Sequence, residues 1–185
     1  MESVDTSPRV ASLKTPEGPQ YLATYIKDGI NLVKERKYEE AIRHLRDPKT
    51  AKEVGLNFET DSRSYLIKKD LSQDEADELA DRIAYDSGFN HLNKTITIAD
   101  VWALGPEITG KPAPKIPQKL FQDVALVHLE EWLHGLQYLV GNPLAGYEDK
   151  ELDVAAYLLK LGAPLTDNFL RRHGRYKHFP FTFSL

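Results

Sequence analysis

The chain has 185 residues, which is enough for one domain, and its hydrophobic (41%) and charged (28%) fractions are those of a globular protein. A formal net charge of −4 argues against a general nucleic-acid-binding surface, and the absence of cysteine excludes disulfides, thiolate metal sites and cysteine nucleophiles. The sequence lacks the apolar core of a signal peptide and any run of about 18 apolar residues, so we expect a cytoplasmic protein without a membrane span.

The chain is expected to divide into an arm and one domain. Residues 1–19 contain three prolines and several Ser and Thr residues without periodicity, which predicts a flexible N-terminal arm. Residues 20–185 are predicted to form a single α+β domain, mostly helical, with a small sheet of a few short strands.

Helical periodicity first appears over residues 20–46, and Asp47-Pro48 is predicted to end that helix. Its His44 is interpreted as a surface residue. A short helix follows from Lys49 to Val54. Ser72 with Glu75 forms a capping box, which predicts an amphipathic helix to about Ser87 with Gly88 as its C-cap.

Two segments favour strands, namely 64–68 and the better-patterned 93–101, in which Thr and Ile alternate. The Pro-rich segment 105–117 predicts a loop ahead of a long helix over 121–140. A last helix is expected to begin at Asp167.

Two charged groups are interpreted as structural. The acidic residues of the helix that follows Ser72 are expected to form a solvated face that suits the helix dipole. The C-terminal basic residues are expected to belong to a tail that covers the core, and they are Arg171, Arg172, Arg175 and Lys177.

The long helix is apolar around most of its circumference, so it is predicted to be largely buried. At about 100° per residue, four polar residues fall within an arc of roughly 60°. They are Asp123, Glu130, His134 and Gln137. Glu131 follows about 60° beyond His134. No Lys or Arg occurs between Lys119 and Lys150, whereas a solvated helix face usually mixes both signs. Carboxylates and an imidazole on a buried helix are what a divalent metal site or an acid–base site needs.

The run Glu130-Glu131-Trp132-Leu133-His134 resembles the H-E-x-x-H motif of zincin metallopeptidases, with Glu130 in place of the first His. The resemblance implies that Glu130 and His134 are ligands of zinc or of another divalent transition metal. It also implies that Glu131 is the general base, which polarises a metal-bound water for attack on a peptide or amide.

The segment that begins Glu151-Leu152-Asp153 resembles the third-ligand helix of small zincins, because small residues and a Leu pair follow. This resemblance implies Glu151 as third ligand, with Asp153 and Gln137 supporting the ligands through hydrogen bonds. The site would then lie between helices 120–140 and 149–161, and a peptide or protein would be the substrate.

Other interpretations of the stripe remain. The domain is a degenerate zincin relative that acts as a binding module, or it is an unrelated helical protein with a satisfied Glu/His network. Glu131-x-x-His134 also matches half of a di-iron motif, but no second Glu-x-x-His occurs in the sequence. His128 points about 120° or more away from the Glu130/His134 face and is interpreted as a core or boundary histidine.

Overall fold

The computed structural model describes residues 17–103, 105–141 and 148–173. This part of the chain is a mostly helical α+β structure with a three-stranded mixed sheet. The elements in chain order are α1 (Glu17–Lys34), α2 (Tyr38–His44), α3 (Pro48–Glu53), β1 (Asn57–Ile67), α4 (Gln73–Asp86), β2 (Gly88–Asn90), β3 (Thr95–Ala103), α5 (Pro106–Thr109), α6 (Gln118–Leu139), α7 (Glu148–Lys160) and α8 (Asp167–His173).

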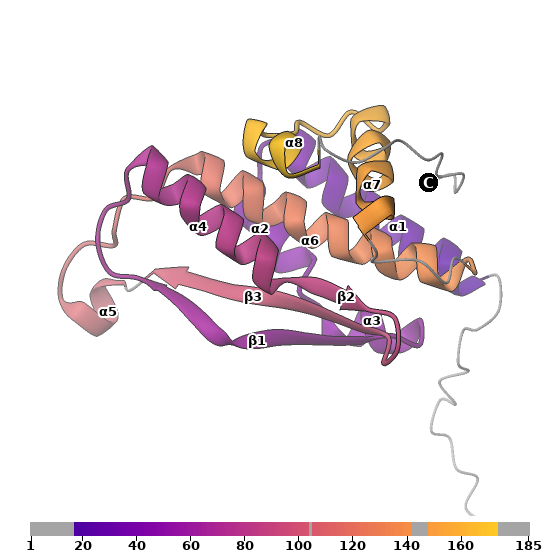
Figure 1. Cartoon of the computed structure of the whole chain (residues 1–185). Coiled ribbons are helices and arrows are strands. Elements are labelled where there is room, and N and C mark those ends of the chain that lie inside the picture. Colours follow the sequence, from indigo (N-terminus) through magenta and orange to yellow (C-terminus); the bar gives the residue numbers. More distant parts are fainter. Residues whose placement is uncertain (1–16, 104, 142–147, 174–185) are drawn as a thin grey trace, which may run out of the picture.

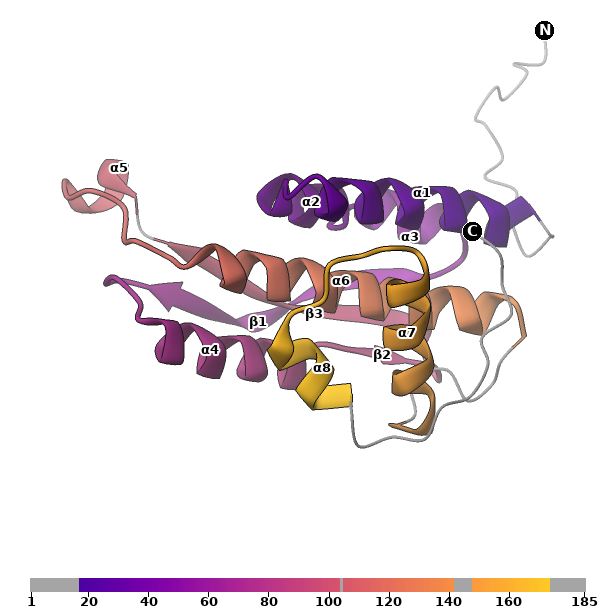
Figure 2. The same cartoon turned by 90° about the horizontal axis from the view of Figure 1, so that it is seen from above.

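Helix α6 is the element around which the others are arranged. It contacts β2 and β3 of the sheet and helices α1, α2, α4, α7 and α8. Figure 1 shows α4 and α6 above the sheet with α7 and α8 beyond them, and Figure 2 shows α1 and α2 on one side of α6 and α4 on the other. As a result, every residue of α6 from Asp123 to Gln137 is buried. The predicted long, buried helix over 121–140 is confirmed.

The sheet has the strand order β1-β3-β2. Strands β1 and β3 are parallel and are linked through α4, whereas β2 pairs antiparallel with the first residues of β3. Ile96 and Ile98 of β3 are fully buried in the same core cluster as α6. The strand predicted over 93–101 is therefore present with shifted ends, and the short one predicted over 64–68 is the last part of a longer β1.

The N-terminal helical region differs from the expectation in two places. Residues 17–19, expected in the flexible arm, form the first turn of α1, while 1–16 lie outside the described residues. The helix predicted over 20–46 is two helices, because the chain turns at Arg36, whose φ of 61° is left-handed. The resulting α1–α2 pair packs along α6.

Trp132 of α6 links α1 and α2 to the core. Its indole Nε1 donates a hydrogen bond of 2.7 Å to the carbonyl oxygen of Leu45, and its ring stacks on Phe58 of β1. The indole and the ring of Tyr25 in α1 are in an edge-to-face arrangement, with ring centroids 4.9 Å apart. His44, interpreted as a surface residue, is half-buried and contacts the Tyr25 carbonyl through Nε2 at 2.9 Å.

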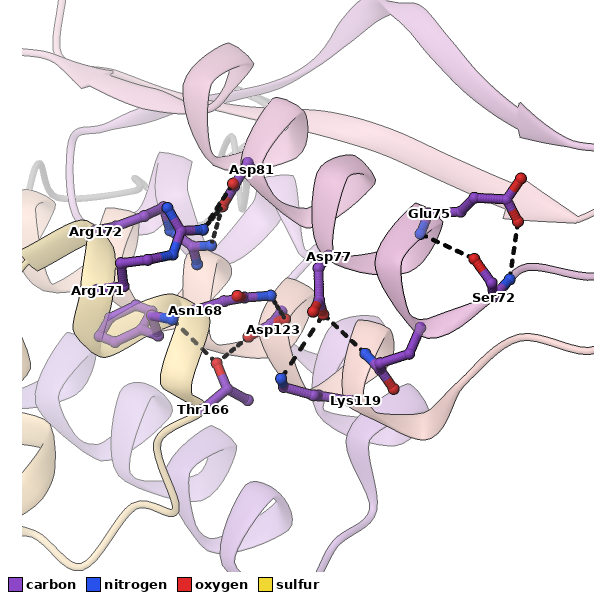
Figure 3. A network of polar contacts seen from close by, with 12 residues as sticks. Ser72, Glu75, Asp77, Asp81, Lys119, Asp123, Thr166, Asn168, Arg171 and Arg172 are labelled. Carbon is purple, nitrogen blue, oxygen red and sulfur yellow. Dashed lines mark hydrogen bonds and ion pairs between the residues drawn. The ribbon is translucent and has the colours of Figure 1, made fainter.

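Helix α4 begins as predicted, with the reciprocal capping box of Ser72 and Glu75 (Figure 3). The prediction of Gly88 as its C-cap is wrong, because Ser87 caps the helix in extended conformation and Gly88 is the first residue of β2. No helix among the described residues is long and apolar enough to cross a membrane.

The substitution Trp132→Phe should destabilise the fold. It leaves the buried Leu45 carbonyl without its indole donor, at about 1–3 kcal/mol, and removes packed volume besides. Urea unfolding measures the difference, with Tyr85→Phe as control because Tyr85 is 90% exposed. A stability of Trp132→Phe within about 0.5 kcal/mol of wild type would contradict this role.

Candidate metal or acid–base site on helix α6

The polar stripe of α6 lies inside the protein. The exposed fractions of its members are 1% for Asp123, 6% for Glu130, 2% for His134 and 0% for Gln137. The helical period puts these residues on one face, and α7 and α8 are among the elements that contact α6. Burial of so many polar groups requires partners within the protein, since an unpaired buried charge costs several kcal/mol.

The imidazole of His134 is held by the amide of Gln137 one turn further along. Nδ1 of His134 lies 3.0 Å from Oε1 of Gln137, and the amide oxygen accepts this hydrogen bond, so Nδ1 carries a proton. Nε2 lies 3.9 Å from Oε1 of Glu130, which is one turn earlier in the helix. The Nδ1 hydrogen bond therefore fixes the ring with Nε2 directed at the Glu130 carboxylate.

Glu131, the predicted general base, is also buried, with 5% of its surface exposed. It leaves the helix about 60° from His134, because three residues advance a helix by about 300°. It therefore flanks the Glu130/His134 pair.

Helix α7 carries the predicted third ligand. It spans 148–160, close to the predicted 149–161, and it contacts α6. Val154, Ala155 and Leu158 of α7 are buried in the same core cluster as the apolar side of α6. Glu151 occupies the position one turn before Ala155. The side chains of Glu151 and Asp153, however, lie outside the described residues.

Two residues of the predicted metal site, Glu130 and His134, have described side chains. Glu130 and His134 offer a carboxylate oxygen and an imidazole nitrogen on adjacent turns, and both donor types suit zinc. Among the described side chains, no group of three His, Asp or Glu residues is placed to hold a metal ion. A third protein ligand would thus have to come from outside them, and Glu151 is the residue that the sequence nominates.

Asp123, the remaining polar residue of the stripe, forms hydrogen bonds with residues at the start of α8. Figure 3 shows its carboxylate beside Thr166 and Asn168, at the start of α8. The Thr166 hydroxyl donates to Asp123 Oδ1 and accepts from the Phe169 backbone N–H at 3.1 Å. Asn168 Nδ2 donates to Oδ2 at 3.4 Å. Asp123 therefore fastens α8 to α6.

The environment of Asp123 shifts its acidity. Burial raises the pKa of Asp123 above its ordinary value, although the hydrogen bond from Thr166 and the charge of Arg172 act in the opposite direction. Sequence spacing gave no sign of this contact, because Thr166 is 43 residues away. The Thr-Asp pair at 166–167 is nevertheless a recognisable helix start.

A second contact between distant segments corrects the interpretation of both charged groups. Arg171 and Arg172 of α8 bind the carboxylate of Asp81 in α4 at 2.8 Å and 3.0 Å (Figure 3). Burial alone would raise the pKa of Asp81, but the hydrogen bonds and charges of the two arginines hold it below its usual range. Asp81 was expected to be solvated, and both arginines were expected in a tail. Arg175 and Lys177 lie outside the described residues.

His128 is buried, with 1% exposed, as expected for a core or boundary histidine. Its Nδ1 donates to the Val124 carbonyl oxygen at 2.7 Å, one turn earlier in α6. By helix geometry it lies at least about 120° from Glu130 and His134, so it belongs to another face of the helix.

The substitution Asp123→Asn should change how stability depends on pH. Because the folded-state pKa is raised, protonation favours the folded state, and stability is lost as pH rises from the ordinary value of 3.8 through the raised one. An asparagine does not titrate, so the stability of wild type should fall relative to that of Asp123→Asn as pH rises through that window. Chemical unfolding between about pH 3 and 7 measures this, with Asp28→Asn on the exposed surface of α1 as control. A wild-type-minus-variant difference that is independent of pH would contradict the assignment.

Comparison of the chain with protein-family models, with curated protein sequences and with solved structures finds no match in any of the three. Function is therefore inferred from the residues of the chain and from their contacts.

Proposed function

We propose that the chain is a zincin-like metal-dependent hydrolase of peptides or amides, with its metal held at the Glu130/His134 face of α6. The observation that carries the proposal is the Gln137–His134–Glu130 arrangement. Gln137 accepts the Nδ1 proton of His134 at 3.0 Å, and Nε2 lies 3.9 Å from the Glu130 carboxylate. Metal-ligating histidines commonly donate the N–H of one ring nitrogen to an oxygen acceptor, which leaves the other nitrogen for the metal.

The residues then take the following roles. Glu130 and His134 bind the metal, Gln137 fixes the tautomer of His134, and Glu151 is the third ligand with Asp153 supporting the set. The metal, zinc or another divalent transition ion, would supply Lewis acidity that activates a water and polarises the substrate carbonyl. Glu131 accepts a proton from the attacking water and gives it to the leaving nitrogen as the C–N bond breaks and the new C–O bond remains.

A different observation favours a second function, and it is the near-complete burial of Glu130, Glu131 and His134. The exposed fractions are only 6% for Glu130, 5% for Glu131 and 2% for His134. A hydrolytic centre must admit water and substrate, whereas a fixed polar network needs neither. In this alternative, His134 is protonated and forms an ion pair with Glu130, and the network keeps α6 in its position in the core. The domain then acts as a non-catalytic interaction module.

Metal content separates the two functions. Purified wild-type protein, incubated with zinc and desalted, should retain about one metal ion per chain, and both His134→Ala and Glu151→Ala should lose it. Matched controls at non-ligand positions, His91→Ala and Glu78→Gln, should keep it. Elemental analysis gives the ratio. A wild type that holds no metal after zinc incubation would overturn the hydrolase proposal and leave the interaction module.

Glu131→Gln tests the proposed base apart from the ligands. The change keeps the shape of the side chain but removes its basicity, so hydrolysis of a mixed peptide pool should fall roughly 100-fold or more. Metal content should stay at the wild-type value, because Glu131 is not a proposed ligand. Mass spectrometry of the cleaved peptides measures the rate, with Glu78→Gln as control. A Glu131→Gln protein that cleaves the pool as fast as wild type would exclude Glu131 as the base.

A further inference from the structure

The α6 face that carries Glu130 and His134 is also the face on which α8 begins. Asp123 lies seven residues before Glu130, so it points in nearly the same direction, about 10.5 Å earlier along the helix axis. The Thr166 hydroxyl and the Asn168 amide both donate to its carboxylate. The start of α8 is therefore seated about two turns from the proposed site, on the same face of α6.

The connection between α7 and α8 lies over α6 as well. Figure 2 shows it crossing α6, and Gln122 Nε2 of α6 donates a hydrogen bond of 2.7 Å to the Pro164 carbonyl oxygen. Glu130 and His134 have exposed fractions of only 6% and 2%. A hydrolytic site on this face would thus admit water and substrate only when an element that covers α6 moves.

Helices α7 and α8 lie on the same side of α6 (Figure 1), but they are held differently. Helix α7 places four buried apolar side chains in the core cluster, whereas Phe169 is the only described residue of α8 that belongs to it. The four are Val154, Ala155, Tyr157 and Leu158. Because apolar burial is the main source of stability, the core fixes α7 more firmly than α8.

The contacts that hold α8 to α4 are polar and partly exposed. Arg171 and Arg172 bind Asp81, and the side chains of Arg171 and Asp81 are 61% and 39% exposed. Ion pairs of this exposure contribute little to stability. Elements with few buried apolar contacts are the ones that open locally, without global unfolding.

We propose that α8 is a lid, which opens by local unfolding while α6 and α7 stay in place, and which thereby uncovers the α6 face that carries Glu130 and His134. The inference rests on the hydrolase proposed above, because a catalytic site needs such an opening and a fixed polar network does not. Since α7 carries the proposed ligand Glu151, an opening confined to α8 leaves the ligand set together.

Acylation of histidine by diethyl pyrocarbonate tests the lid on the full chain in metal-free buffer, because the reagent attacks neutral imidazole that solvent reaches. Mass spectrometry gives separate rates for His134 and His128. The double variant Arg171→Gln/Arg172→Gln removes the ion pairs to Asp81 and should raise the rate at His134 about fivefold or more. His128, which is 1% exposed and on another face of α6, should keep its wild-type rate.

Hydrogen exchange of the backbone amides measures the opening itself. In wild type, the amides of α8 should exchange about tenfold faster or more than those of residues 154–158 in α7, and the double variant should speed exchange in α8 alone. Arg82→Gln, at an exposed position elsewhere on α4, should change neither the exchange nor the acylation. Arg171→Gln alone is the milder variant and should give the same pattern with a smaller change.

Three results would overturn the lid. One is α8 exchange in wild type that is as slow as that of α7. Another is a double variant whose α8 exchange, or whose rate at His134, equals that of wild type. The third is an equal acceleration of His134 and His128 in both variants, because α6 would then open as a whole. Neither readout uses a metal, so failure of the hydrolase, seen as a chain that holds no zinc, is distinguished from failure of the lid.

Discussion

Helix α6 is buried from Asp123 to Gln137, yet it carries three carboxyl groups and two imidazoles within that stretch. Buried ionisable groups are tolerated only where hydrogen bonds or opposite charges replace the water that they lose. The rest of the fold can be understood as meeting this requirement. The sheet, the α1–α2 pair and helices α4, α7 and α8 bury the apolar surface of α6, and the end of α2 and the start of α8 also supply partners for its polar atoms.

The partners come from segments far apart in the sequence. Asp123 is satisfied by Thr166 and Asn168 at the start of α8, and the Trp132 indole by the Leu45 carbonyl at the end of α2. His134 is satisfied within the helix by Gln137. Helix α8 is held a second time by Arg171 and Arg172 on Asp81 of α4. The contacts between different segments also fix one element relative to another.

Local patterns in the sequence predicted the local features of the structure. The capping box of Ser72 and the apolar periodicity of α6 depend on neighbouring residues, and both are present. The part of β1 before residue 64 was missed because residues 57–63 are polar apart from Phe58, so their strand conformation depends on pairing with β3. The turn at Arg36 was missed because a left-handed residue outside glycine leaves no sequence signal.

The candidate site was predictable in composition but not in its contacts. A polar stripe on an apolar helix identified Glu130, His134 and Gln137, and helix geometry alone brings them together. The contacts of Asp123 and Asp81 depend on how α8 folds back over α4 and α6, which no local pattern encodes. Helix geometry likewise places His128 on a different face of α6 from Glu130 and His134.

The protonation state of His134 distinguishes a metal ligand from one half of a buried ion pair. Long-range ¹H–¹⁵N correlation NMR of the full chain near pH 7 reports on both ring nitrogens. The account predicts a neutral ring with the proton on Nδ1, as the contact with Gln137 requires, and a change in the Nε2 resonance when zinc is added. A ring protonated on both nitrogens and insensitive to zinc would contradict it, because His134 would then be paired permanently with Glu130.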